Sequence, residues 1–246
     1  MNEVTRREFV KAASAVTAVG ATTLPAWAVQ ENRDPIKIGF IGCGGRGTGA
    51  ANQALNANEN AVIWAMGDAF EARLTSSQKA LLDEQGSRAE VPKERQFVGF
   101  DAYQKVIDSG VDMVILTTPP HFRPAHIAAA VKAKKHVFCE KPMAVDGSGV
   151  RSVMESTKLA KENGTNLMSG FCWRYNLPIR AAFKQLHNGA IGDGRSYFAT
   201  YYSAPLWTKP RKENWSDVEW QMRNWVHYDW LSGDHITEQH VHNLDA

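Results

Sequence analysis

The sequence predicts an α/β protein, a doubly wound parallel sheet of the Rossmann type followed by the start of a second α+β domain. Three observations favour this class. Short apolar strands alternate with helices over residues 33–170, a glycine-rich turn joins the first strand to the first helix, and an acid ends the second strand. The strands are apolar on both faces, as a parallel sheet covered by helices on both sides requires.

The elements of this first domain alternate along the chain. We expect strands at residues 36–41, 61–68, 95–100, 111–118, 136–142 and 165–171. We expect helices at about residues 46–57, 70–85, 102–110, 121–135 (helical after Pro124) and 148–164. Gly110 closes one helix, and Pro119 and Pro120 end the fourth strand, because glycine and proline both interrupt regular elements.

Residues 171–246 differ in composition and predict part of a substrate-binding and oligomerisation domain. A helix is expected within residues 174–192, an aromatic strand at 194–207, and the beginning of another helix at 234–246. One strand and one entering helix cannot close a core, so we interpret the chain as C-terminally incomplete.

Residues 1–28 predict an export signal. Arg6 and Arg7 form a charged start, residues 15–25 an apolar middle, and a small-residue cleavage site ends at Ala28. The stretch around the paired arginines resembles the twin-arginine signal, which exports folded proteins. We therefore expect a periplasmic protein carried by the twin-arginine machinery. An ordinary secretory signal or an amphipathic N-terminal helix is the alternative.

The charge and the cysteines restrict the class of partner and site. A formal charge of +2 over 246 residues gives no basic field, which argues against nucleic acid as a partner. Cys43, Cys139 and Cys172 are far apart in the sequence and form no CxxC pair. We expect all three to be small buried hydrophobic side chains.

The turn after the first strand carries a phosphate-binding motif. Gly42, Gly44 and Gly47, with Gly45 and Arg46 between them, fit G-x-G-x-x-G between a predicted strand and a predicted helix. The first glycine permits a tight turn, the second lets the backbone approach a pyrophosphate, and the third lets helix and strand pack closely. The helix N-terminus then faces the negative charge.

Asp68 ends the second strand about 20 residues past this loop, where the dinucleotide fingerprint places an acid for the ribose hydroxyls. A carboxylate there repels a 2′-phosphate, so the sequence favours NAD over NADP as the cofactor. Asp68 could also be the N-cap of the following helix.

With the loop, Asp68, "TTPPHFRP" (117–124) and "CEKPMA" (139–144) taken together, the sequence resembles the Gfo/Idh/MocA family of oxidoreductases. The resemblance implies an NAD-binding domain and residue roles. It implies that the loop beside the nicotinamide ribose comprises Thr118, Pro119, Pro120 and His121, and that the Glu-Lys-Pro motif comprises Glu140, Lys141 and Pro142. The lysine of that motif is placed at the reacting carbon and its oxygen. The position of Lys141 at the carboxyl end of a predicted parallel strand, where ligands bind in doubly wound folds, also favours a functional role. The alternative is a solvated lysine before a loop proline.

The resemblance also implies an acid and a histidine four residues apart. Aligned on "HNLD", these positions are Glu238 and His242, and the glutamate departs from the usual aspartate. On a helix His235, Glu238 and His242 share one face. Three explanations stay open: a general base with an orienting acid, a metal site, or a polar helix face. The metal explanation would need His240 from the wrong face, so we expect no metal.

Five tryptophans fall within 24 residues near the end of the chain. They are Trp207, Trp215, Trp220, Trp225 and Trp230. Aromatic faces among polar groups suit a sugar ring, and they equally suit anchoring of an arm onto its own domain or onto a neighbouring subunit.

These features predict an NAD-dependent oxidoreductase acting on a sugar or polyol hydroxyl. The catalytic residues are Lys141, His242 and Glu238. The resemblance implies a small carbohydrate substrate and a homo-oligomer formed through the second domain. Two alternatives stay open: a glycoside hydrolase that retains NAD and oxidises a ring carbon transiently, and a non-catalytic exported protein that binds NAD or a sugar.

Overall fold

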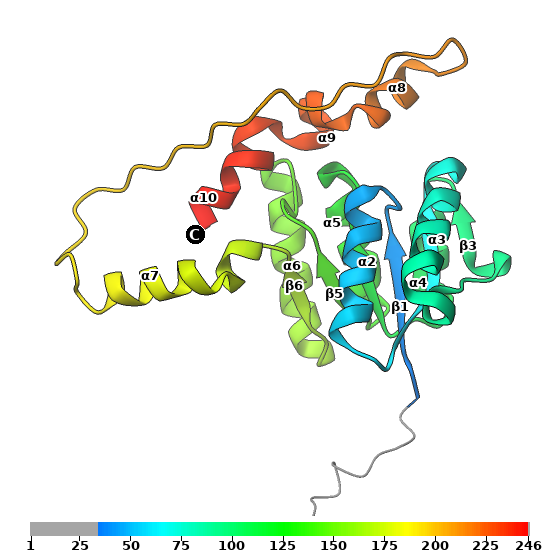
Figure 1. Ribbon diagram of the computed structural model, residues 1–246, viewed down its shortest axis with the longest axis horizontal. Coiled ribbons are helices and arrows are strands. Elements are labelled where there is room, and N and C mark those ends of the chain that lie inside the picture. The colour runs from blue at the N-terminus through cyan, green and yellow to red at the C-terminus, as the bar shows by residue number, and fades with distance from the viewer. Residues whose placement is uncertain (1–33, 246) are drawn as a thin grey trace, which may run out of the picture. The chain divides into compact units, whose positions relative to one another are not determined.

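The computed structural model describes residues 34–245 (Figure 1). The chain divides into two units, residues 1–35 and 36–246, and the described residues belong almost wholly to the second. The predicted export signal therefore lies outside the described residues. Among residues 34–245, no helix combines the length and the apolar character that crossing a membrane demands.

The second unit is built on a parallel sheet with the strand order β3-β2-β1-β4-β5-β6. The strands are β1 (Ile36–Ile41), β2 (Ala61–Asp68), β3 (Gln96–Val98), β4 (Met113–Leu116), β5 (His136–Cys139) and β6 (Leu167–Ser169). The order reverses between β1 and β4, and ligands of doubly wound folds bind at such a switch point, beyond the carboxyl ends of the strands. The predicted Rossmann class is confirmed.

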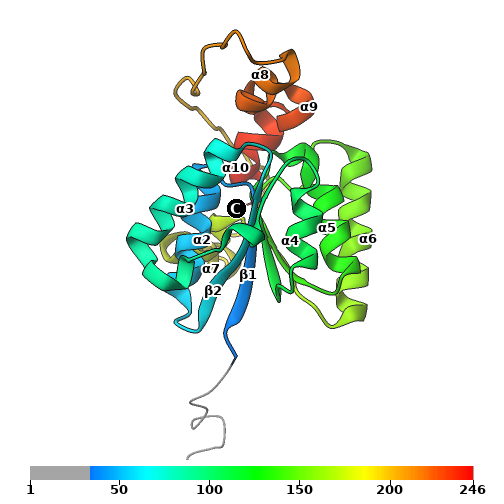
Figure 2. The same cartoon turned by 90° about the vertical axis from the view of Figure 1, so that its right-hand side faces the viewer.

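Helices cover both faces of this sheet, as Figure 2 shows. On one face lie α2 (Gly45–Ala57) and α3 (Glu71–Gln85); on the other lie α4 (Ala102–Asp108), α5 (Arg123–Lys132) and α6 (Gly147–Asn163). Single 3₁₀ turns occur at Gly86–Ala89, Lys93–Arg95, Pro120–Phe122, Cys172–Tyr175 and Trp225–His227.

The two faces of the sheet give two apolar cores. Phe40 and Leu55 are buried in the core beneath α2 and α3, whereas Val114 and Ile127 are buried in the core beneath α4, α5 and α6. Each fully buried side chain of this size contributes about 1.5–3 kcal/mol relative to exposure. Burial on both faces explains why the strand sequences are continuously apolar rather than alternating.

The prediction for the cysteines is confirmed at two positions and wrong at the third. Cys43 and Cys139 are buried in the cores, but Cys172 is exposed. Cys172 begins the 3₁₀ turn at which the chain leaves the sheet, so no core surrounds it.

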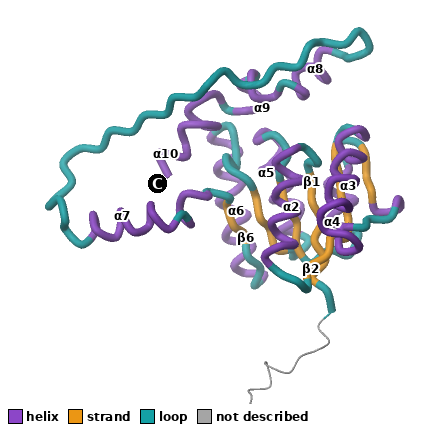
Figure 3. Tube along the Cα trace, viewed as in Figure 1, coloured by secondary structure: helices purple, strands orange, loops and turns teal. Residues whose placement is uncertain are grey.

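Beyond the sheet, α7 (Leu177–His187) forms as predicted, and residues 188–216 contain neither helix nor strand (Figure 3). The strand predicted at 194–207 is therefore wrong. A strand needs a neighbour for its backbone hydrogen bonds, and none pairs with this segment in the described part of the chain. Its aromatic side chains Phe198 and Tyr202 are almost fully exposed.

The chain then folds back in short helices, α8 (Asp217–Arg223) and α9 (Asp229–Ser232). A π-helical turn at Ile236–His240 leads into α10 (Val241–Asp245). The final helix expected from residue 234 thus exists, but its middle part, Ile236–His240, is π-helical rather than α-helical.

Candidate active site

The glycine loop has the geometry that a pyrophosphate requires. Gly42 has φ +99°, a conformation that favours glycine, and a Cβ on Gly47 would lie only 1.8 Å from the Gly42 carbonyl oxygen. A Cβ on Gly44 would meet the end of one flexible side chain, Arg73 Nη1, at 2.6 Å. The flexible guanidinium of Arg73, rather than backbone, therefore lies over Gly44, directly before the N-terminus of α2 where a phosphate would bind.

Asp68 fastens this loop to the end of β2. Its Oδ2 accepts a hydrogen bond from Cys43 N at 2.7 Å, and its Oδ1 accepts one from Phe70 N at 2.8 Å. Burial raises the pKa of Asp68, and the two backbone hydrogen bonds oppose that rise. The N-cap of α3 is Phe70, so the N-cap alternative for Asp68 is wrong. Each carboxylate oxygen keeps a further lone pair for a ribose hydroxyl.

A cavity of about 400 Å³ opens at this edge of the sheet. Its walls include the glycine loop and Asp68 from one side and residues 117–119 from the other. This volume lies in the range of small-molecule sites.

A second cavity between α2 and α3 is lined by three cationic side chains, Arg73, Lys209 and Arg223. The Nε atom of Arg73 is buried without a hydrogen-bond partner. Burial lowers the pKa of Lys209, and the charges of Arg73 and Arg223 lower it further. Arg223 pairs with Glu219 at 2.8 Å. Three cationic side chains beside a glycine loop suit an anionic ligand, so the described residues fit a dinucleotide with its phosphates.

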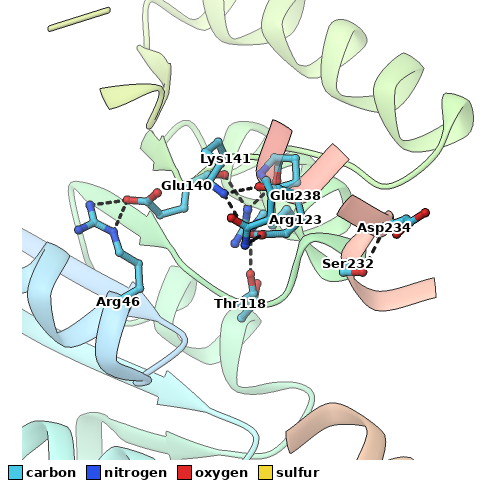
Figure 4. Close-up of polar contacts among 10 residues, drawn as sticks. Arg46, Thr118, Arg123, Glu140, Lys141, Ser232, Asp234 and Glu238 are labelled. Carbon is cyan, nitrogen blue, oxygen red and sulfur yellow. Dashed lines mark hydrogen bonds and ion pairs between the residues drawn. The ribbon is translucent and has the colours of Figure 1, made fainter. Parts of the chain in front are cut away.

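Arg46 and Glu140, both expected to contact the cofactor, pair with each other (Figure 4). Glu140 Oε1 accepts from Arg46 Nε at 2.7 Å and from Nη2 at 2.5 Å. The pair joins α2 to the end of β5 across the switch point. The ion pair therefore connects the glycine loop to Glu140, the residue directly before Lys141.

Arg123 is a site residue that the sequence analysis missed. Its guanidinium is buried and donates from Nε to Thr118 O at 2.7 Å, and from Nη1 to Glu140 O at 2.9 Å and Pro142 O at 2.6 Å. It thus ties the loop after β4 to the Glu-Lys-Pro loop after β5. Burial lowers the pKa of Arg123. The only signal in the sequence was an arginine inside the "HFRP" motif.

The residues of the loop after β4 are divided between this cavity and the C-terminal segment. Thr118 and Pro119 line the cavity, and Thr118 Oγ1 lies 3.3 Å from His126 Nδ1. Pro120 begins the 3₁₀ turn, and the His121 ring makes an edge contact with Trp230 at 5.2 Å between centroids.

Lys141 and Glu238 form a nearly buried ion pair, drawn in Figure 4. Lys141 Nζ lies 2.9 Å from Glu238 Oε1 and also donates to the Glu238 backbone oxygen. The exposed fractions of the two side chains are 12% and 10%. Because Lys141 is both nearly buried and paired, the solvated-lysine explanation for this residue is wrong. Its partner Glu238 lies 97 positions further along the chain.

His242 stacks on Trp173 and on Tyr201, with centroid distances of 5.5 and 6.3 Å. Its Nδ1 is buried without a hydrogen-bond partner. Burial lowers the pKa of His242, and the nearby charge of Lys141 lowers it further. The imidazole is therefore neutral at pH 7 and able to accept a proton.

The relation expected between Glu238 and His242 differs in the structure. We expected Glu238 to orient the imidazole, but its carboxylate bonds Lys141 and Gln239 instead. The π-helical turn is the physical reason, because its i→i+5 hydrogen bonds change the angular spacing of the residues.

Of the three residues expected on one face, His235 and His242 both contact the Tyr201 ring, at centroid distances of 6.0 and 6.3 Å. Glu238 differs from them, because its carboxylate bonds Lys141. His235 is exposed and its Nε2 lies 3.3 Å from Tyr201 O, whereas Glu238 is buried. His240 is half-buried with an unpartnered Nε2. Within residues 34–245, no three His, Cys, Asp or Glu side chains come together in a way that could hold a metal ion.

The five tryptophans make their contacts with other residues of the second unit, to which they themselves belong. Trp207 and Trp225 line the 400 Å³ cavity, Trp215 contacts the Arg223 guanidinium, and Trp220 makes an edge contact with Tyr228. Together with the contact of Trp230 on the loop after β4, these contacts agree with the anchoring explanation.

Comparison with known proteins adds a family. Residues 36–171, more than half of the chain, match the Gfo/Idh/MocA oxidoreductase family, which has an NAD-binding Rossmann fold. A myo-inositol 2-dehydrogenase from Thermotoga maritima is 30% identical over 157 residues, 64% of this chain and 42% of that enzyme. An inositol 2-dehydrogenase from Rhizobium meliloti is 28% identical over 158 residues, 64% of this chain and 42% of that enzyme.

Solved structures of oxidoreductases are also similar to this chain. A scyllo-inositol dehydrogenase from Lactobacillus casei with bound NAD(H) and scyllo-inositol has a TM-score of 0.53 at 25% identity, covering 65% of this chain and 43% of that one. A 3-ketoreductase from Actinomadura kijaniata with bound NADP has a TM-score of 0.50 at 26% identity, covering 65% and 46%. The chain spans less than half the length of these relatives.

Proposed function

The chain belongs to the Gfo/Idh/MocA family of oxidoreductases, and from that premise we propose that it oxidises a hydroxyl of a sugar or polyol with a nicotinamide dinucleotide. One observation carries the proposal. The buried Lys141–Glu238 pair and the neutral His242 lie beside the carboxyl end of β5, on the same edge of the sheet as the glycine loop. The inositol dehydrogenases among the relatives support a polyol as the substrate class.

The residues divide the reaction between them. A bound nicotinamide ring supplies the acceptor for the hydride that leaves the carbinol carbon. His242, neutral at pH 7, accepts the proton of the substrate hydroxyl. Lys141 holds the oxygen as its charge develops and it becomes a carbonyl. Glu238 acts through Lys141, because its carboxylate fixes the position of the ammonium group.

NAD is the cofactor that we propose, because the Asp68 carboxylate faces the ribose position and repels a 2′-phosphate. The cations Arg73, Lys209 and Arg223 act in the opposite direction on an added phosphate. Titration of the protein with NAD and NADP separately decides this. Tighter binding of NADP would contradict the NAD assignment and leave the proposed reaction class untouched.

The location and the domains are proposals as well. The paired arginines Arg6 and Arg7 support export through the twin-arginine machinery to the periplasm, with cleavage after Ala28. Residues 33–170 are proposed as the cofactor domain, and residues 171–246 as part of a substrate and oligomerisation domain. N-terminal sequencing of periplasmic protein tests the first of these.

Replacing Lys141 with Met tests the proposed reaction. Lys141→Met should bind NAD as tightly as the wild type and should lose turnover by about 10³-fold or more, because a preorganised charge at the developing oxygen is absent. Reduction of NAD is followed with a panel of inositols, sugars and glycosides, and NAD binding is measured by calorimetry.

Lys158→Met, at an exposed position of α6, is the matched control and should keep full activity. Normal turnover by Lys141→Met would overturn the role of the lysine. Release of an aglycone by the wild type without net formation of NADH would overturn the dehydrogenase assignment.

A further inference from the structure

We propose that residues 207–231, which we name the cap, form the second wall of the cofactor site, enclose the adenosine half of the dinucleotide and slow its release. Asn224 holds this wall together. The inference rests on the proposed use of a dinucleotide, and it assigns to residues 207–231 a role in binding the cofactor, in addition to the substrate role proposed for residues 171–246.

The cap shares one cavity with the glycine loop. Trp207, Lys209, Met222 and Trp225 line the same 400 Å³ space as the glycine loop and Asp68. The acid at the end of the second strand marks the ribose of the adenosine half. The aromatic and cationic side chains of the cap therefore lie over that half of the site.

These side chains match the chemistry of an adenosine diphosphate group. Trp207 and Trp225 offer ring faces on which a base can stack. Lys209 adds a cation to those of Arg73 and Arg223, next to the place where the phosphates approach Gly44. The cap thus offers an apolar face for the base and positive charge for the phosphates.

Asn224 joins the two segments of the cap. Its Oδ1 accepts from Lys209 N at 2.6 Å, and its Nδ2 donates to Lys209 O at 3.2 Å and to Trp220 O at 3.1 Å. Only 1% of the Asn224 surface is exposed, so water could not replace these partners if a substitution removed the amide. A second link lies nearby, where His227 Nε2 is 2.9 Å from Trp207 O.

The cap is attached to the Rossmann part of the chain, residues 36–170, on both sides of the cavity. On the β2 side, the Arg223 guanidinium lies 4.0 Å from the centre of the Phe70 ring. On the β4 side, Trp230 contacts His121 and Leu231 is completely buried. A segment fixed on both sides of the cavity must open before a bound dinucleotide leaves, and this predicts slow release of the cofactor.

The experiment measures the release of two ligands from the 246-residue chain, NAD and ADP-ribose, by competition in a stopped-flow instrument. Trp225→Ala removes a stacking surface, and Asn224→Ala separates the two segments. Each variant should release both ligands at least about tenfold faster than the wild type. Because ADP-ribose lacks the nicotinamide ring, the same factor for both ligands assigns the effect to the adenosine half.

Lys209→Ala serves as a further variant, because this residue is exposed and Asn224 bonds only its backbone N and O, which the substitution keeps. It should weaken binding of both ligands about fivefold or more. Tyr202→Ala, at a position 93% exposed, is the aromatic control and should release both ligands like the wild type.

The outcomes separate this inference from the proposed function. Wild-type release rates in Trp225→Ala and Asn224→Ala, with wild-type affinity in Lys209→Ala, would overturn the cap and leave the dinucleotide site standing. Accelerated release without turnover on any sugar or polyol would support the cap and count against the proposed reaction. A wild-type protein that binds neither NAD nor ADP-ribose would overturn both.

Discussion

The two walls of the cofactor cavity are built by different physical means. The Rossmann wall is backbone, namely the glycine loop and strand ends, supported by side chains such as Phe40 and Met66 that are completely buried. The cap wall is made of side chains, and Asn224, Met222 and Leu231 are among its few buried residues. The first wall is therefore part of the folded core, whereas the second depends on a few hydrogen bonds and ring contacts.

This difference determines what a substitution can do. A change in the Rossmann wall disturbs the packing of the core, so it should lower the stability of the whole unit together with ligand binding. A change in the cap should alter release of the ligand and local opening, and leave global unfolding almost unchanged. Three substitutions test that contrast, in order of decreasing effect.

Gly47→Ala should have the largest effect. The added Cβ would lie 1.8 Å from the Gly42 carbonyl oxygen, which is backbone and cannot move aside without opening the contact between α2 and β1. We expect loss of NAD binding and a decrease of about 3 kcal/mol in the free energy of unfolding. Denaturant unfolding and calorimetry measure the two quantities.

Gly45→Ala is the matched control, because a Cβ at this position meets no atom within 4 Å. It should keep its stability and its NAD affinity. Equal behaviour of the two alanine variants would show that the Rossmann wall tolerates bulk, against the contrast drawn above.

His126 should make the Rossmann wall sensitive to acid. Burial, with a smaller contribution from Arg123, lowers the pKa of His126 to about 4. Because the unfolded chain binds a proton near pH 6.5, the folded state loses stability as the pH falls below that value. The loss should be about 2 kcal/mol between pH 7 and pH 5, measured by denaturant unfolding.

His126→Gln removes this titration and should reduce the slope of the profile over the same range. The difference between wild type and variant isolates His126 from two other groups. His242, whose pKa burial also lowers, acts with the same sign, and Asp68, whose pKa burial raises, acts with the opposite sign. Parallel profiles for the two proteins would contradict the assignment.

Ser216→Ala should have the smallest effect and should stay within the cap. Ser216 caps α8 by accepting a hydrogen bond from Glu219 N at 3.1 Å. Its loss should cost about 1 kcal/mol of local helix stability. Hydrogen exchange should be faster at α8 amides alone, with the global unfolding midpoint unchanged. A lowered midpoint would show that the cap and the core unfold as one unit.

Much of the Rossmann unit could be predicted because its signals are local. The strand patterns, the glycine spacing and Asp68 each follow from a few neighbouring residues, and the structure has the expected strands and helices in the expected order. The strand expected at 194–207 failed because a strand depends on a partner elsewhere in the chain.

The sequence by itself determined the class of fold, the phosphate loop and the identity of the lysine after β5, since local periodicity and turn chemistry specify these. Only the tertiary structure decided that Glu238 pairs with Lys141 rather than with His242, that Arg123 ties two loops, and that Asn224 joins the cap. The reason is physical. A buried polar group takes whichever partner the packed chain brings within hydrogen-bond distance, and for Lys141 that partner is 97 residues away.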